Sequence, residues 1–389
     1  MMYRFLLCII AAASSSSGAA IEPRAGCEIN PLLYANSPLV IPTGSDQFIY
    51  PEYGDTTLKF AVGETVDFIC PGRNLVVLGS QAQEVVQGIC ISNLRFRILG
   101  ERTLFSQISC AGDAVASSRL TGEELRERRD VCFDPVAQSP LYTFYNLTAS
   151  IGNNAKGTPR PSFSEDSGFY NLGTLTVNSR YTRANQRATV NTLIGLEFTS
   201  IKYIDNGNWY FLARGHLTAR SDFFYPAQQN GTFRYINAAP QWQSFNGLNW
   251  NEAELSTRAY ADANGLDLQV WTGVYGVTTL QHEATGRDVG LYIYVDSNGN
   301  TALPAPDIYW KVVYDPISRR GVALIGLNNP YQTDVAKSVI CPDVSNSLTW
   351  VSWKKESIND GYSYACTVPE LRRVVSYAPD LDVSGGLLL

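Results

Sequence analysis

The segment ARGHLTARSDFF, residues 213–224, contains the side chains best suited to chemistry. His216 is one of only two histidines in 389 residues, and Arg214 stands two positions before it. An imidazole can take a proton from water near neutral pH, and a guanidinium donates charged hydrogen bonds to anionic oxygens. An isolated histidine more often serves packing than catalysis. The interpretation therefore depends on the residues that follow.

Three polar side chains follow in an ordered series. Asn237 comes first, and Asn246 and Glu254 then flank Trp250 at a spacing of four residues. One regular helix would place the last three on the same side, with Asn246 and Glu254 ~12 Å apart. They could not then bind one small cation directly. One could ligate Mg²⁺ while the other acts through its bound water, because Mg²⁺ keeps several waters and takes few protein oxygens.

These side chains match what phosphodiester hydrolysis requires. The reaction needs an activated water, neutralisation of charge at the phosphoryl group and help for the leaving oxygen. His216 would act as the general base, and Arg214 would contact a non-bridging oxygen. Mg²⁺ on Asn246, or Mn²⁺ in its place, would polarise the phosphate. Glu254 would orient the metal's waters.

Three motifs carry a resemblance to a known family. They are R-G-H at residues 214–216, Y-x-N-x-x-P-Q at 235–241 and N-x-x-x-W-x-x-x-E at 246–254. The series resembles the DNA/RNA non-specific endonucleases, which are ββα-metal or His-Me finger nucleases. RPSF at 160–163 and YWKVVY at 309–314 look most like the secreted arthropod branch, with its digestive, salivary and duplex-specific nucleases.

The resemblance implies a role for each residue of the series. His216 becomes the general base, Asn246 the single protein ligand of Mg²⁺, and Glu254 the holder of the metal's waters. Arg214 becomes a phosphate or transition-state contact, and Asn237 supports the site. The implied substrate is DNA, RNA or both, with double-stranded forms expected first. The implied products carry 5′-phosphate and 3′-hydroxyl ends.

The sequence departs from the family pattern at one position. Ala213 stands where the motif D-R-G-H has Asp, which we interpret as reduced support for the site. The family also uses an upstream arginine, for which Arg180 and Arg183 are candidates. Gly215 is expected to let the backbone turn tightly beside the site.

The charge distribution indicates where an anion would bind. A net charge of −6 argues against a basic coat for bulk capture of nucleic acid. Residues 156–220 nevertheless carry eight basic and four acidic side chains, a local balance of +4. A predicted helix over 179–195 would align three arginines on one face, which serves either phosphate contact or a solvated surface. The candidate nucleic-acid contacts are Arg180, Arg183, Arg187 and Arg220.

The chain divides into three predicted parts. Residues 1–20 are predicted to be a secretory signal peptide, since a positive charge precedes a short apolar run that ends in small residues. Residues 21–135 predict a smaller, cysteine-containing, β-rich domain. Residues 136–389 predict an α+β nuclease domain with a mostly antiparallel sheet and helices over 246–265 and 368–378. We expect a secreted protein with no membrane association.

The number of cysteines fits a secreted protein. Seven remain once Cys8 leaves with the signal peptide, so most should form disulfides and one should stay unpaired. Cys341 and Cys366 are the natural late pair. Asn146 and Asn230 begin glycosylation sequons.

Two other classes of function remain open on the sequence. One is a catalytically weak protein that binds and sequesters DNA or RNA, for which Ala213 and the acidic net charge speak. The other is a carbohydrate-binding β-module with exposed aromatic residues, which leaves the His–Asn–Glu series unexplained. Metal dependence separates the enzyme from the binder. The second histidine, His282, matches no motif and is expected in a surface loop.

Overall fold

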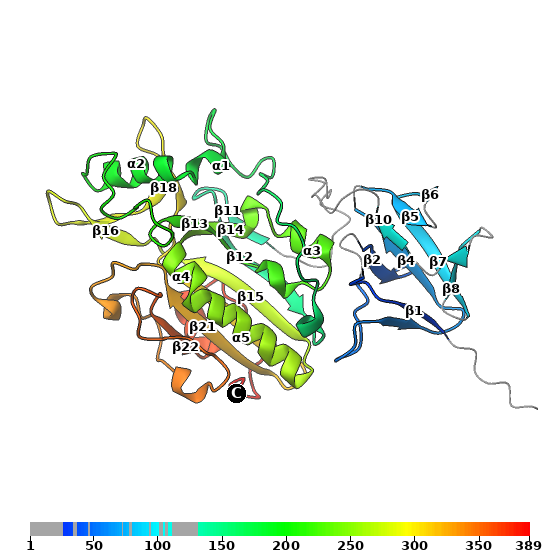
Figure 1. The fold of residues 1–389 in the computed structure, drawn as a ribbon. Helices are drawn as coiled ribbons and strands as arrows, with labels where there is room; N and C mark the ends of the chain where they lie inside the picture. The colour runs from blue at the N-terminus through cyan, green and yellow to red at the C-terminus, as the bar shows by residue number, and fades with distance from the viewer. Residues whose placement is uncertain are drawn as a thin grey trace, which may run out of the picture.

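The computed structural model describes two β-rich parts of the chain (Figure 1). The described residues are 26–33, 37–45, 47–71, 73–77, 80–92, 95–100, 104–105, 108–110 and 131–389. The predicted signal peptide lies outside them.

The N-terminal part consists of short antiparallel strands around a core of its own, as the alternating sequence pattern predicts. Phe96 packs edge-to-face on Phe60 and Phe68 in this core. A disulfide joins Cys27 to Cys90. The strands are β1 Cys27–Ile29, β2 Leu39–Pro42, β3 Leu58–Phe60, β4 Thr65–Ile69, β5 Leu75–Val77, β6 Ser80–Gln81, β7 Val85–Ser92, β8 Arg95–Ile98, β9 Leu104–Phe105 and β10 Ile108–Cys110.

The larger part is built on a six-stranded antiparallel sheet in the order β11-β12-β15-β20-β21-β22. Its strands are β11 Val131–Asp134, β12 Ser139–Leu147, β15 Leu268–Tyr275, β20 Ile308–Asp315, β21 Arg320–Leu327 and β22 Ser363–Cys366. Three two-stranded sheets accompany it, formed by β13 Leu212–His216 with β14 Ala238–Trp242, β16 Thr279–Gln281 with β17 Asp288–Gly290, and β18 Tyr292–Val295 with β19 Thr301–Pro304. The predicted α+β class with a mostly antiparallel sheet is confirmed.

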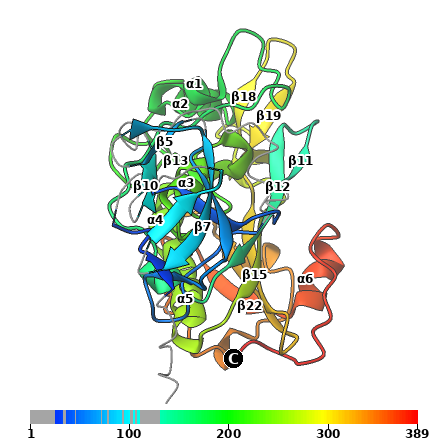
Figure 2. The same ribbon diagram turned by 90° about the vertical axis from the view of Figure 1, so that its right-hand side faces the viewer.

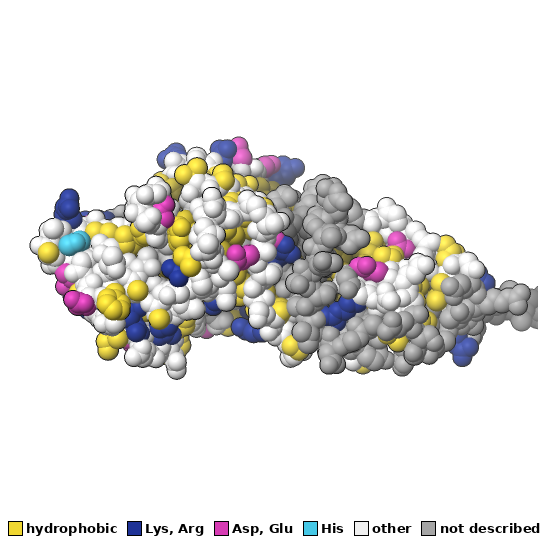
Figure 3. Space-filling view, turned by 90° about the horizontal axis from the view of Figure 1, so that it is seen from above, with side chains coloured by type: hydrophobic (Ala, Val, Ile, Leu, Met, Phe, Trp, Pro, Cys, Tyr) yellow, Lys and Arg dark blue, Asp and Glu magenta, His cyan; other side chains and the backbone are white. Residues whose placement is uncertain are grey.

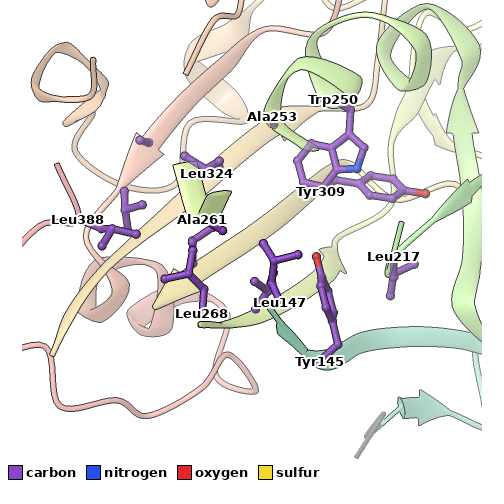
Figure 4. Close-up of a cluster of buried hydrophobic side chains, with 14 of the residues drawn as sticks. Tyr145, Leu147, Leu217, Trp250, Ala253, Ala261, Leu268, Tyr309, Leu324 and Leu388 are labelled. Carbon is purple, nitrogen blue, oxygen red and sulfur yellow. The ribbon is translucent and has the colours of Figure 1, made fainter. Parts of the chain in front are cut away.

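Both faces of the main sheet are covered. All eight residues of β20 are buried, because alternate side chains enter different cores. Tyr309 and Val313 join the core under helix α5 (Asn249–Asn264), whereas Trp310 and Val312 join the core under α6 (Val368–Val374). Figure 2 shows the two helices on opposite sides of the sheet, and Figure 4 shows Tyr309 beside Trp250 of α5. Trp250 is a core residue, as expected.

Two predicted helices are each interrupted. The helix expected over 246–265 is split at Leu248, whose backbone (φ −117°, ψ −102°) is not helical. The helix expected over 179–195 breaks after Arg180. The helices are α1 Val177–Arg180, α2 Arg183–Leu193, α3 Pro226–Gly231, α4 Gln243–Gly247, α5 and α6, with 3₁₀ turns η1 Ile151–Asn153, η2 Arg220–Asp222, η3 Tyr235–Asn237, η4 Val335–Lys337 and η5 Ser345–Ser347.

The N-terminal part packs beside α3. Tyr50 lies against Phe224 and Tyr225, and a hydrogen bond runs from Gln228 Nε2 to the Tyr50 hydroxyl at 2.9 Å. The Tyr225 hydroxyl donates to the carbonyl of Ile49. This junction fixes the N-terminal part close to the segment that follows His216.

The cysteine pattern agrees with the expectation at two points. The disulfide Cys341–Cys366 is present, which confirms the predicted late pair. Cys132 is the free cysteine of the described chain, and burial raises the pKa of its thiol. No helix in the described residues has the length and apolar character needed to cross a membrane.

A buried group of charges links the segment after β13 to the sheet and to α5. Asp222 is 2% exposed and accepts hydrogen bonds from Tyr145 of β12 and from Arg258 Nη1 at 2.5 Å. Lys311 Nζ of β20 lies 3.9 Å from Asp222 Oδ2 and donates to the Tyr145 hydroxyl at 3.2 Å and to Thr272 at 2.6 Å. We call Asp222, Tyr145, Arg258 and Lys311 the buried charge cluster.

Replacing Lys311 with Met should lower the free energy of unfolding by about 3–5 kcal/mol, because it leaves Asp222 with one cation fewer in a buried setting. Denaturant unfolding measures the change. The control is Lys202→Met, which breaks the half-exposed pair with Glu283 at 2.6 Å and should cost at most about 1 kcal/mol. Equal losses in the two variants would contradict the importance of the cluster.

Candidate active site

Strand β13 presents Arg214 and His216 on the same face, because side chains alternate along a strand. Its partner β14 is antiparallel, with His216 opposite Ala238. Helix α4 follows β14 directly, so the site is built on a β-β-α unit. Figure 1 shows this unit beside the main sheet.

Gly215 has a different role from the one expected. It lies within β13 rather than in a turn. A Cβ atom there would come within 2.3 Å of Gln241 Oε1 and 2.7 Å of the Tyr309 hydroxyl. Glycine is therefore required for close packing behind the strand. Ala213 lies on the same face of β13 as Gly215 and pairs with Gln241, so an Asp there would act from behind the strand, away from His216.

Two phenyl rings flank the imidazole of His216. The ring centroids of Phe163 and Phe233 lie 5.0 and 5.1 Å from it, and Phe233 is nearly perpendicular to it. Phe163 belongs to the RPSF segment, so this motif contributes a wall of the site. The rings restrict the orientation of the imidazole and shield one side of it from water.

The guanidinium of Arg214 is held by polar and aromatic neighbours. Its Nη2 donates to Asn178 Oδ1 at 2.7 Å, and its Nε donates to the Tyr235 hydroxyl at 3.0 Å. The Tyr235 hydroxyl in turn donates to Asn178 Oδ1 at 2.8 Å. The ring of Tyr181 lies 5.0 Å from the guanidinium carbon, within cation–π range. Arg214 is thus fixed on the face that also carries His216.

Asn237 uses its whole amide group inside the protein. Its Oδ1 accepts from the backbone N–H of Thr218 at 2.9 Å, and its Nδ2 donates to the carbonyls of Thr218 and Thr232 at 3.0 and 2.9 Å. The side chain is 5% exposed. This arrangement anchors the backbone two residues after His216, which suits a supporting residue rather than one that contacts substrate.

Asn246 lies on α4 and not on the long helix α5, because the chain breaks at Leu248. The regular spacing to Glu254 that the sequence predicts is therefore wrong. Asn246 is half-buried, and its Nδ2 donates to Gln243 Oε1 at 3.1 Å. With the nitrogen engaged in this way, the amide oxygen is the atom that could ligate a cation.

Glu254 of α5 belongs electrostatically to the buried charge cluster. Burial, reinforced by the negative charge of Asp222, raises the pKa of Glu254 from 4.5 to about 7, against the opposing effect of Lys311 and Arg258. The same burial lowers the pKa of Lys311. Glu254 therefore gains and loses its proton near neutral pH, where its charge would matter to a bound cation.

The available donors fit a hydrated Mg²⁺. Mg²⁺ prefers oxygen ligands and is commonly bound through one or two protein groups with several waters retained. Asn246 offers an amide oxygen, and Glu254 a carboxylate whose ionised form can accept hydrogen bonds from water. Among the described residues no cluster of three or more His, Cys, Asp or Glu side chains is placed to hold a metal.

The predicted arginine contacts are dispersed. Arg180 ends the short helix α1, whereas Arg183 and Arg187 lie on α2 and donate to backbone carbonyls of the loop at 204–207. Arg220 donates to the carbonyl of Thr158, and its Nε lacks an acceptor among the described residues. The one continuous face of arginines that the sequence predicts is not formed.

The distribution of charged side chains on the surface agrees with the separate placement of these arginines. In Figure 3, Lys and Arg side chains occur in small separate groups with Asp and Glu between them, and no continuous basic band crosses the face in view. His282 lies in the turn between β16 and β17, as expected of a loop residue.

Sequence reasoning missed several residues of the site region. Asn178 and Tyr181 come from α1 and its end, and no motif pointed to their contact with Arg214. The sequence did contain a signal for Asp222 and Lys311, because Asp222 lies in ARGHLTARSDFF and Lys311 lies in YWKVVY. A lysine in the middle of an apolar strand predicts a buried partner of opposite charge.

Comparison with known proteins identifies the family. The profile of the DNA/RNA non-specific endonucleases matches residues 116–371. The chain belongs to this family. The β-β-α unit with His216 and Asn246 lies within the matched region.

Two similar proteins are salivary. A "Salivary endonuclease" of Lutzomyia longipalpis is 32% identical over 284 residues, which cover 70% of this chain and 63% of the relative. "Salivary protein Tsal1" of Glossina morsitans morsitans is 24% identical over 273 residues, 68% of this chain and 64% of the relative. The matched region thus spans less than two thirds of either relative.

A solved structure is also similar to this chain. It is titled "Crystal structure of the EndoG/EndoGI complex: Mechanism of EndoG inhibition", with 17% identity and a TM-score of 0.39. The match covers 65% of this chain and 82% of that one.

The two asparagines of the motif should respond differently to mutation. Asn237→Ala should lower the free energy of unfolding by about 2–4 kcal/mol, because it leaves buried backbone groups without partners. Asn246→Ala should cost less than about 1 kcal/mol, since its side chain is half-exposed. Denaturant unfolding of both variants measures this difference. A larger loss for Asn246→Ala would contradict the assigned roles.

The raised pKa of Glu254 predicts a pH-dependent stability. Between pH 4.5 and about 7 the folded protein holds a proton that the unfolded chain has released, so the free energy of unfolding falls as pH rises through this window. Glu254→Gln should flatten that fall. Thermal unfolding across pH 4–8 measures it, and Glu283→Gln on the surface should leave it unchanged. A wild-type stability that rises with pH relative to Glu254→Gln would contradict the assignment.

Proposed function

We propose that this protein is a secreted, metal-dependent endonuclease that hydrolyses phosphodiester bonds of DNA, RNA or both, including double-stranded forms, without base specificity. The observation that carries the proposal is the placement of Arg214 and His216 on one face of β13, with Asn246 on the helix that follows its partner strand. The products carry 5′-phosphate and 3′-hydroxyl ends.

In the proposed reaction each side chain has one task. His216, oriented between Phe163 and Phe233, takes the proton of the attacking water. Arg214 binds a non-bridging phosphate oxygen through the N–H groups that Asn178 and Tyr235 leave available. These side chains act on the phosphate group and its attacking water, and not on the base edges. The proposed cleavage therefore has no base specificity.

Mg²⁺, when bound, supplies Lewis-acid polarisation of the phosphate and stabilises the leaving oxygen. Asn246 would hold it through the amide oxygen. Glu254 would accept hydrogen bonds from its waters, and Asn237 keeps the backbone after His216 in place. Mn²⁺ takes similar oxygen ligands and could replace Mg²⁺.

Secretion is supported by the predicted signal peptide and by the names of the salivary relatives. The disulfides Cys27–Cys90 and Cys341–Cys366 suit an oxidising compartment. The sequon residue Asn146 is exposed on β12, which leaves it accessible to glycosylation.

One observation favours a second candidate, a catalytically weak protein that binds and sequesters nucleic acid. Both amide atoms of buried Gln241, the cross-strand neighbour of Ala213, lack a hydrogen-bond partner among the described residues, and the Asp that the family has at position 213 is missing beside it. Since position 213 faces away from His216, we expect the loss to weaken support of the strand and not to abolish proton transfer.

Cleavage of plasmid DNA and of long double-stranded RNA, each with Mg²⁺ and with EDTA, tests the proposal. Wild-type protein should cleave at least one of them only with the metal, and His216→Ala should be slower by about 10²–10⁴-fold. The matched control is His282→Ala, which removes the other histidine and should retain full activity. Ligation of the products without prior kinase treatment would establish the 5′-phosphate.

Tight binding without cleavage in any divalent metal would overturn the enzyme and favour the sequestering protein. Ala213→Asp would then be the first variant to assay for restored activity. Cleavage by His216→Ala at the wild-type rate would overturn the assignment of the general base.

A further inference from the structure

An exposed indole lies beside Gly247, the residue that follows the candidate metal ligand Asn246. Trp209 is 45% exposed, although it lies in the short segment that leads into β13. Its backbone carbonyl accepts from Ser244 N of α4 at 3.0 Å. A Cβ atom on Gly247, the residue directly after Asn246, would come within 3.1 Å of the Trp209 ring. Glycine at 247 thus leaves room for the indole against α4, the helix that carries Asn246.

The segment that carries Trp209 is fixed by the two arginines of α2. Arg183 Nη1 donates to the carbonyls of Asp205 and Gly207 at 2.6 and 2.9 Å. Arg187 donates to the carbonyls of Ile204 and Asp205 at 2.7 and 3.0 Å. On the other side, Gln243 N donates to the carbonyl of Phe211 at 2.9 Å.

The indole of Trp209 is held at a fixed position while part of it faces solvent. Nearly half of a large aromatic surface stays in water, and the loop that carries it is held by two guanidinium groups that donate to several carbonyls. The indoles of Trp242 and Trp250 in the neighbouring elements are buried, so Trp209 differs from them in presenting its ring to solvent. A fixed, exposed π face is what a stacking partner requires, and it is pre-ordered before the partner arrives.

We propose that Trp209 is a stacking subsite for an unpaired nucleobase next to the phosphate that is cleaved. This inference rests on the proposed nuclease function and names a substrate contact for it. A nucleobase fits because every base has a π face, so that stacking adds affinity without base specificity. Arg183 and Arg187 then serve nucleic-acid binding indirectly, as positioning residues for the loop. A base inside a duplex is already stacked, so the subsite favours single strands and opened ends.

Equilibrium binding in EDTA separates stacking from cleavage. Fluorescence anisotropy should be measured with a labelled single-stranded DNA oligonucleotide and with a matched oligonucleotide of equal charge whose central nucleotides are abasic. Wild-type protein should bind the base-containing strand about 5- to 150-fold more tightly, the range for one stacked base. Trp209→Ala should bind both strands equally weakly, and Trp209→Phe should fall between.

The control variant is Tyr53→Ala. Tyr53 is 56% exposed and also lies against a glycine, Gly265, but at the opposite end of α5. It should keep the wild-type preference for bases. Thermal unfolding of all variants should agree, which confirms that each is folded.

Equal affinity of wild-type protein for the two strands would overturn the subsite, as would an unchanged base preference in Trp209→Ala. A change in oligomeric state caused by Trp209→Ala, without loss of base preference, would instead indicate a protein contact and also overturn it. Failure of the nuclease proposal can be distinguished from failure of the stacking subsite. The nuclease proposal fails if wild-type protein shows no metal-dependent cleavage, whatever the binding measurements give.

Discussion

The site depends on one buried interaction, the contact of Asp222 with Arg258 and Lys311. Asp222 ends the turn that follows His216, Arg258 belongs to α5, and Lys311 belongs to the central strand β20. Because unpaired charges are costly in a buried setting, these elements are held together at one relative placement. That placement sets the strand bearing the proposed base against the helices bearing the proposed metal donors. Burial, together with the negative charge of Asp222, raises the pKa of Glu254 beside the same cluster.

Much of the fold could be predicted from local sequence pattern. The runs that became β12, β15, β20 and β21 are rich in β-branched and aromatic residues, and the Cys341–Cys366 pair followed from spacing along the chain. The breaks within the predicted helices were harder to predict. Leu248 has good helix propensity, yet its neighbour Asn249 donates to the carbonyls of Lys354 and Gly361, more than 100 residues away. Long-range contacts of this kind override local propensity.

The candidate site, like the fold, was only partly predictable from the sequence. His216, Asn246 and Glu254 are candidates because their types and order suit phosphodiester chemistry, and the structure places the first two on one β-β-α unit. Their supporting contacts were not predictable. Asn178 meets Arg214 from 36 residues away, and Arg183 and Arg187 bind loop carbonyls rather than presenting a basic face. Backbone carbonyls have no signature in a sequence, so an arginine bound to them looks like one exposed for phosphate.

In the proposed site, Asn246 and Glu254 form the metal-binding end and His216 is the proton acceptor. Anomalous diffraction from crystals soaked in Mn²⁺ tests it most directly. We expect an anomalous peak within coordination distance of Asn246 Oδ1, with His216 not among the ligands, and loss of that peak in Asn246→Ala crystals. A peak ligated by His216, or one that persists in Asn246→Ala, would contradict it.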